Sequence, residues 1–150
     1  MKKILLYCLT ILSLLILLAG CSKKVNDNNK PEMFKSDKLG FSIVFPETWK
    51  DKYRIEENDM GITVYFKPKE KIEDCYGKLF AFTNKNSVNF YEDSFDTVCD
   101  QRYFEAKGVT YVIGGPTDVN FPEDHSEFNT FLKMKGELKE ALKTLKIIDK

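Results

Sequence analysis

Alternating apolar and polar residues dominate the middle of the chain. Phe41, Ile43 and Phe45 lie two positions apart, the spacing of side chains that share one face of a β-strand. The same alternation predicts strands at 53–55 and 62–66. Each run is short and ends at glycine, proline or asparagine, so the pattern indicates several short strands rather than one long element.

Glycine-containing turns separate these strands and predict antiparallel hairpins. The segment Asn58-Asp59-Met60-Gly61 predicts the first turn, and Lys107-Gly108 predicts the last one. A further strand is expected at 77–83, and the last hairpin is expected to join 99–106 to 109–113. The segment 84–97 between them is polar but contains aromatic residues, and we expect a surface loop with its aromatic rings folded back.

The C-terminal segment follows a helical period. Its apolar residues recur at spacings of three and four, which places them on one stripe of a helix. Asp124 and Glu127 stand three apart before this stripe and predict a capping box. The stripe consists of Phe128, Phe131, Leu132, Leu138, Ala141, Leu142 and Leu145. We therefore predict an α+β fold, an antiparallel sheet of five to six strands with an amphipathic C-terminal helix packed on one face.

The N-terminal part has a different composition. Two lysines precede the apolar run 4–19, and small residues precede Cys21, which is the order of a secretory signal. An uncleaved transmembrane anchor is the alternative, but the run is shorter than the roughly 20 apolar residues of a spanning helix. We expect a signal peptide at 1–20, a flexible polar tether at 21–38 and one folded domain at 39–150.

The segment Leu18-Ala19-Gly20-Cys21 resembles the lipobox of bacterial lipoproteins. The resemblance implies cleavage between Gly20 and Cys21 and a diacylglyceryl group on the Cys21 thiol. Two acyl chains anchor a protein stably, whereas one gives only reversible binding. We therefore expect an extracytoplasmic domain, anchored by lipid to the cell membrane or, in a host with two membranes, to the outer membrane.

Charge and cysteine content narrow the choice of partners. The chain carries 23 basic and 23 acidic residues, and loss of the two leader lysines leaves a small excess of acids. No dense basic cluster occurs, so we expect no nucleic-acid partner. Cys8 leaves with the signal and Cys21 takes the lipid, so Cys75 and Cys99 either form a disulfide or remain separate buried thiols.

Sequence motifs for catalysis are missing. The chain has no nucleophile elbow, phosphate-binding glycine loop, dinucleotide fingerprint, C-x-x-C or H-E-x-x-H motif, and His125 is its only histidine. We therefore predict no catalytic residue, no metal and no cofactor.

The densest polar group precedes the predicted helix and is a candidate ligand loop. Alternating oxygen ligands can hold a hard cation such as Ca²⁺, whereas turn formation and helix capping explain the same residues without a ligand. His125 is expected to be an exposed residue of the first helical turn. The loop contains Asp118, Asn120, Asp124 and His125. A second acidic group is expected to be a solvated loop and comprises Glu92, Asp93 and Asp96.

The segment Gly40-Phe41-Ser42-Ile43-Val44-Phe45-Pro46-Glu47-Thr48-Trp49 resembles the opening of PsbP-like domains, in which a Gly-Phe strand ends in Pro followed closely by Trp. The resemblance extends over about Leu39 to Lys150, and the whole chain is similar to small uncharacterised lipoproteins of low-GC bacteria. It implies an antiparallel sheet with flanking helices, a fold used mostly in non-enzymatic accessory and assembly proteins.

These observations favour a membrane-anchored envelope lipoprotein that is a non-enzymatic accessory module and binds an envelope protein, a peptide or a small ligand. One alternative is an envelope hydrolase or metal-dependent enzyme that uses the loop from Asp118 to His125. Another is an immunity lipoprotein against a secreted toxin, which only size and location suggest.

Overall fold

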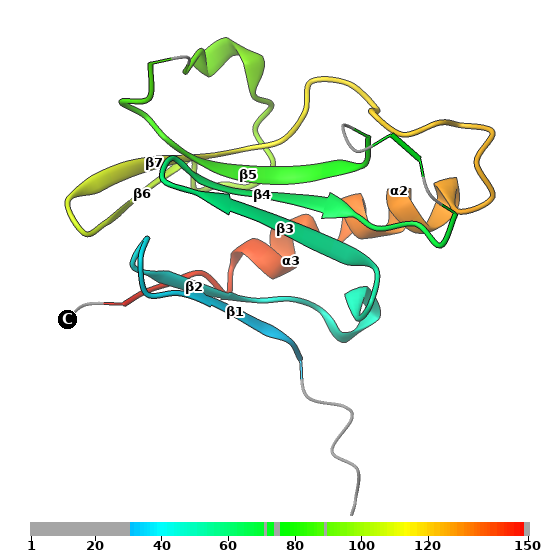
Figure 1. Cartoon of the computed structure of the whole chain (residues 1–150), viewed down its shortest axis with the longest axis horizontal. Coiled ribbons are helices and arrows are strands. Elements are labelled where there is room, and N and C mark those ends of the chain that lie inside the picture. Colours follow the sequence, from blue (N-terminus) through cyan, green and yellow to red (C-terminus); the bar gives the residue numbers. More distant parts are fainter. Residues whose placement is uncertain (1–30, 71, 74–75, 89, 149–150) are drawn as a thin grey trace, which may run out of the picture.

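The structure, a computed structural model, describes residues 31–70, 72–73, 76–88 and 90–148. These residues form an α+β fold with two antiparallel sheets and C-terminal helices, which confirms the predicted fold class (Figure 1). The strands are β1 (Met33–Ser36), β2 (Phe41–Val44), β3 (Tyr53–Asn58), β4 (Gly61–Phe66), β5 (Lys78–Asn84), β6 (Tyr103–Ala106), β7 (Val109–Gly114) and β8 (Lys146–Ile147). The helices are the single turns η1 (Glu47–Trp49) and η2 (Glu92–Ser94) and the α-helices α2 (Phe128–Gly136) and α3 (Leu138–Leu142).

The strands divide between two sheets instead of forming the single sheet that we predicted. The larger sheet has the order β3-β4-β5-β7-β6, and the smaller one has the order β1-β2-β8. The prediction was wrong because β2 does not pair with β3. Pro46 and η1 follow β2 and redirect the chain, so β2 pairs with β1 and β8.

Strand β1 lies inside the segment that we predicted to be a flexible tether. It pairs with β2 from Met33 opposite Val44 to Ser36 opposite Phe41. The buried Ser36 hydroxyl donates to the Glu57 carboxylate at 2.6 Å and accepts from the Leu39 N–H at 3.0 Å. The fold therefore begins before Leu39, because strand pairing and hydrogen bonds hold residues 33–36. Residues 21–30 lie outside the described part of the chain.

The two predicted hairpin turns are confirmed. The turn after β3 allows Asn58 to pair with Gly61, and Lys107 and Gly108 connect β6 to β7 with φ angles of +50° and +73°. Positive φ at both central residues is typical of the tight turns that match strand twist.

Aromatic rings fill the space between the two layers. Phe41 and Phe45, predicted to share one face, are fully buried. The Phe41 ring meets the Phe82 ring edge-on at 5.2 Å, and the Phe45 ring stacks on Trp49 at 5.7 Å. Such ring geometries add to the free energy of burial. The apolar alternation along β2, β4 and β5 therefore builds one continuous core.

The predicted C-terminal helix is divided into α2 and α3, which lie behind the larger sheet in Figure 1. The division falls at Gly136 and Glu137. Glycine is a weak helix former, and the Glu137 carboxylate accepts hydrogen bonds from Trp49 Nε1–H at 2.8 Å and from the Thr48 hydroxyl at 2.7 Å. The hydrogen bonds from Thr48 and Trp49 to Glu137 thus mark the point where α2 ends, although the apolar stripe continues into α3.

The connection between β5 and β6 runs beside the end of β7, where Asp96 forms an isolated bridge with Gly115, and we call residues 90–102 the strap. Phe95 and Val98 of the strap lie so close to Gly114 and Gly115 that a Cβ on either glycine would come within 2.6 Å of a strap side chain. As expected from the sequence, the Phe95 ring folds back, whereas Tyr91 is 72% exposed.

Two other glycines, one in a close backbone contact and one in open space, provide a matched test of packing. A Cβ at Gly61 would lie 1.8 Å from the Phe82 carbonyl oxygen, and its φ is +141°. Gly61→Ala should therefore lower the free energy of unfolding by more than about 2 kcal/mol, measured by urea denaturation. Gly136 has open space around it, so Gly136→Ala should raise that free energy by up to about 1 kcal/mol. Equal unfolding midpoints for the two variants would contradict this account.

Candidate functional site

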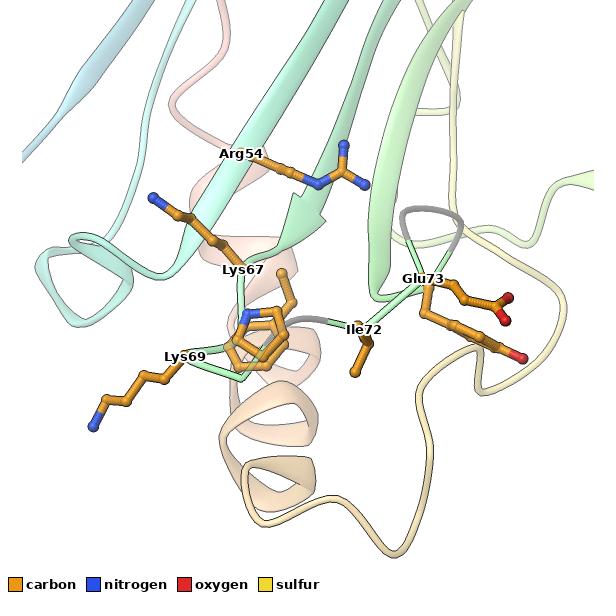
Figure 2. A pocket seen from close by; sticks show the side chains of 8 residues that line it. Arg54, Lys67, Lys69, Ile72 and Glu73 are labelled. Carbon is orange, nitrogen blue, oxygen red and sulfur yellow. The ribbon is translucent and has the colours of Figure 1, made fainter.

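A pocket of about 240 Å³ opens where β3 begins and β4 ends, and we call it the β3–β4 pocket (Figure 2). Residues of both strands and of the connection from β4 to β5 line it. Its lining consists of Arg54, Phe66, Lys67, Pro68, Lys69, Ile72, Glu73 and Tyr76.

The floor of the pocket is apolar and belongs to the core. The Phe66 ring is 1% exposed and contacts the rings of Phe121 at 5.2 Å and Phe131 at 6.0 Å. Ile72 also packs against the core, and Pro68 ends β4 because it lacks the N–H that continued pairing requires. A side chain packed in this way keeps its rotamer, so the floor is a fixed surface.

Backbone hydrogen bonds hold the pocket's connection to its neighbours. The Phe66 N–H donates to the Gly77 carbonyl at 2.7 Å, and the Gly77 N–H donates to the Asn120 carbonyl at 2.8 Å. The Lys69 N–H donates to the Glu127 carboxylate at 2.7 Å. The connection is therefore attached to the segment before α2 at two points, Lys69 and Gly77.

The charges of the pocket lie at its rim. The Arg54 guanidinium lies over the Tyr65 ring, 3.9 Å from its centroid, and forms an ion pair with Glu56. Figure 2 shows Lys67 and Lys69 extending to the side away from Glu73. Neither lysine forms an ion pair with any acidic side chain in the described ranges. One side of the rim is therefore positive.

The predicted ligand loop does not assemble into a metal site. Asp118 and Asp124 are exposed, whereas Asn120 and His125 are partly buried. Within the residues that the structure describes, no group of three or more histidine, cysteine, aspartate or glutamate side chains could hold a metal ion. The loop instead supplies the Asn120 carbonyl that supports Gly77 beside the pocket.

His125 points inward, contrary to the exposed position that we predicted. Its ring meets the Phe121 ring edge-on at 4.9 Å, and its Nδ1 accepts the Glu127 N–H at 3.0 Å. Nε2 of His125 and Oδ1 of Asn120 are buried without a hydrogen-bond partner among the described residues. The predicted capping box is also wrong: Glu127 is the N-cap residue of α2 and makes no side-chain cap, and its carboxylate instead accepts the backbone N–H of Lys69.

Glu92 anchors the strap instead of being part of a fully solvated acidic loop. Its carboxylate accepts hydrogen bonds from the Tyr103 hydroxyl and from Arg102 Nε, the latter at 3.2 Å. The Tyr103 hydrogen bond lowers the pKa of Glu92, because it favours the charged carboxylate. Asp93 is exposed, and Asp96 pairs with Gly115 through the backbone. Of the three acidic residues, Glu92 and Asp96 are therefore held by hydrogen bonds, and the Asp93 side chain is exposed to solvent.

The cysteines are only partly described. Cys75, Cys21 and Gly20 lie outside the described residues, so the disulfide, lipidation and cleavage stay predictions. The Cys99 thiol donates to the Gln101 carbonyl at 2.9 Å. It lines a hollow of about 120 Å³ beside Leu142. Burial raises the pKa of this thiol.

A comparison with protein-family models, curated proteins and solved structures finds no match to this chain. No helix within the described ranges is long and apolar enough to span a membrane.

Sequence reasoning missed the β3–β4 pocket. The signal in the chain is the segment Lys67-Pro68-Lys69, where two lysines flank a proline directly after a strand that ends in a buried ring. The position of Arg54 beside this segment depends on the pairing of Arg54 with Tyr65, which the sequence pattern does not specify.

Cys99 gives a test of the local environment. In a chain that starts at Ser22 and carries Cys75→Ser, iodoacetamide should alkylate Cys99 more slowly than in the same chain unfolded in urea. The reason is the raised pKa, which lowers the thiolate fraction at a given pH and moves the rate–pH midpoint upward. Intact-protein mass spectrometry follows the reaction, and equal rates in the folded and unfolded chains would refute the assignment.

Proposed function

We propose that the protein is a lipid-anchored, extracytoplasmic binding module with a PsbP-like domain and without a catalytic role. The observation that carries the proposal is the β3–β4 pocket, which combines a fixed apolar floor with cations at its rim. A concave apolar surface with a few polar groups around it is the common form of a ligand site.

The environment of His125 supports binding over hydrolysis. Its Nδ1 accepts a backbone N–H, and its Nε2 has no hydrogen-bond partner among the described residues. A general base must lie within hydrogen-bond reach of the nucleophile that it activates. The imidazole therefore supports α2 structurally, and we propose neither an enzyme nor a metal site in the loop 118–125.

The observed architecture is consistent with the PsbP-like resemblance. Pro46 follows β2, and Trp49 is fully buried against Phe45, which gives these residues of the opening segment a structural role. The antiparallel sheets with C-terminal helices agree with the fold that the resemblance implies.

The position of the first described residues supports a location of the pocket near the membrane. The Tyr53 hydroxyl donates to the Glu32 carboxylate at 2.7 Å, and Tyr53 pairs with Phe66, whose ring forms the pocket floor. The first described residues therefore lie at the same end of the larger sheet as the pocket. The segment from Cys21 to Pro31 can span at most about 35 Å when fully extended. A lipid on Cys21 would thus hold this end close to the bilayer.

Replacement of Cys21 tests the anchor. Full-length Cys21→Ser should lose incorporation of labelled palmitate, because the thiol that carries the acyl chains is absent. Cys99→Ser is the matched control and should incorporate the label like the wild type. A wild-type chain that takes up no label and keeps residues 1–20 in its intact mass would instead favour an uncleaved anchor.

Substitutions in the pocket test the binding role. The full-length lipidated protein is cross-linked and purified from its own membrane, and material released from it is identified by mass spectrometry. Ile72→Asp places a charge on the apolar floor and should abolish recovery of a ligand or partner. Leu132→Asp, at a 40% exposed position on α2, is the control and should retain it.

Tyr76→Ala provides a second pocket variant in case Ile72→Asp perturbs the fold, and circular dichroism monitors folding of each variant. Tyr76→Ala should also lower recovery, because the Tyr76 side chain lines the pocket. Recovery of the same material from the wild type and all three variants would contradict the proposed site.

A further inference from the structure

We infer that the β3–β4 pocket binds a small amphipathic anion, in which one carboxylate or phosphate group is joined to a short apolar chain. The inference rests on the proposed binding role and specifies the chemistry of the ligand. Three properties of the pocket lead to it: its volume, its floor and the position of its charges.

The volume limits the size of the ligand. At about 240 Å³, the pocket is smaller than the roughly 300–1,000 Å³ of sites for drug-sized molecules and cofactors. It therefore suits a short apolar chain of the length of octanoate with its head group, and it is too small for a nucleotide or a haem.

The floor requires that part of the ligand be apolar. Phe66 belongs to the core, and Ile72 packs against it. Pro68 also lines the pocket and has no side-chain hydrogen-bonding group. A ligand that covered these side chains with polar atoms would lose hydrogen bonds to water without replacing them. An acyl or aliphatic chain covers them without this loss.

The rim determines the sign of the head group. Arg54, Lys67 and Lys69 all line the pocket, and neither lysine is neutralised by an ion pair with a described residue. Figure 2 shows that the two lysines extend to the side away from the Glu73 carboxylate. The Arg54 guanidinium is held against Tyr65 and already pairs with Glu56, so the two lysines are the partners of the head group. An anionic head group therefore has favourable partners on the lysine side, where a cation would be repelled.

Three probes with the same eight-carbon chain separate charge from apolar contact. The ¹⁵N-labelled chain from Ser22 onward, which contains every described strand and helix, is titrated with octanoate, octanamide or octylamine below their aggregation limits. Octanoate should shift the backbone resonances of Lys67, Lys69 and Ile72 and bind at least ~10-fold more tightly than octanamide. Octylamine should leave these resonances unchanged, and added salt should weaken octanoate binding.

Charge reversal at the rim provides the matched variant. Lys67→Glu/Lys69→Glu should lower octanoate affinity at least ~10-fold while leaving octanamide binding within about two-fold. Lys133→Glu/Lys146→Glu reverses the same number of exposed lysines on α2 and β8 and should bind octanoate like the wild type. Both double variants alter exposed side chains, so their folds should remain intact.

A comparison of octanoate with N-acetyl-leucine distinguishes two sources of the same chemistry. Tighter binding of octanoate supports a lipid-derived acid, and tighter binding of N-acetyl-leucine supports the carboxyl terminus of a peptide. Equal affinity for all three eight-carbon probes, preference for octylamine, or shifts confined to other residues would overturn the inference. If capture depends on the pocket but the pocket binds octanoate no more tightly than octanamide, only the inferred anionic class of the ligand is wrong. If capture does not depend on the pocket, the proposed function is wrong.

Discussion

Burial of the Phe66 ring against Phe121 and Phe131 brings together three segments that are far apart in the chain. Phe66 ends β4, Phe121 lies in the connection after β7, and Phe131 is on α2. Aromatic rings bury large apolar areas, and the Phe121 and Phe131 rings also stack on each other at 5.0 Å, so displacement of one ring would disturb all three. The positions of α2 and of the segment before it therefore depend on this cluster.

The same cluster explains why a pocket exists at this end of the molecule. Phe66 contributes its ring to the core while its position also lines the β3–β4 pocket, so the stability of the core maintains the pocket floor. Charged groups cannot enter such a floor without a partner, because an isolated buried charge carries a large desolvation cost. Lys67 and Lys69 are exposed, and they remain at the rim where water solvates them. An apolar floor with cations around it thus follows from burial of the ring beside a lysine-rich turn.

Local periodicity predicted the strands better than it predicted their partners. Alternation identified the buried faces of β2, β4 and β5, and glycine identified the turn from β6 to β7, because both signals act within a few residues. Pairing is not local. Strand β1 has only four residues and is held by β2 and by the hydrogen bond from Ser36 to Glu57, and β8 has only two residues. Neither produces a pattern in the sequence, so one sheet was predicted where two occur.

Polar side chains were harder to place than apolar ones, since their positions depend on distant hydrogen-bond partners. His125 was expected in solvent, but its ring packs against Phe121 and its Nδ1 accepts the Glu127 N–H. The Glu127 carboxylate accepts the backbone N–H of Lys69 instead of capping its own helix. The pocket has the same origin, because its cations come from positions that only strand pairing brings together. Its floor is part of the core, whereas its lysines are exposed and contribute little to folding. Changes at the rim can therefore alter which ligand is preferred while the fold stays the same, so specificity and stability depend on different residues of one site.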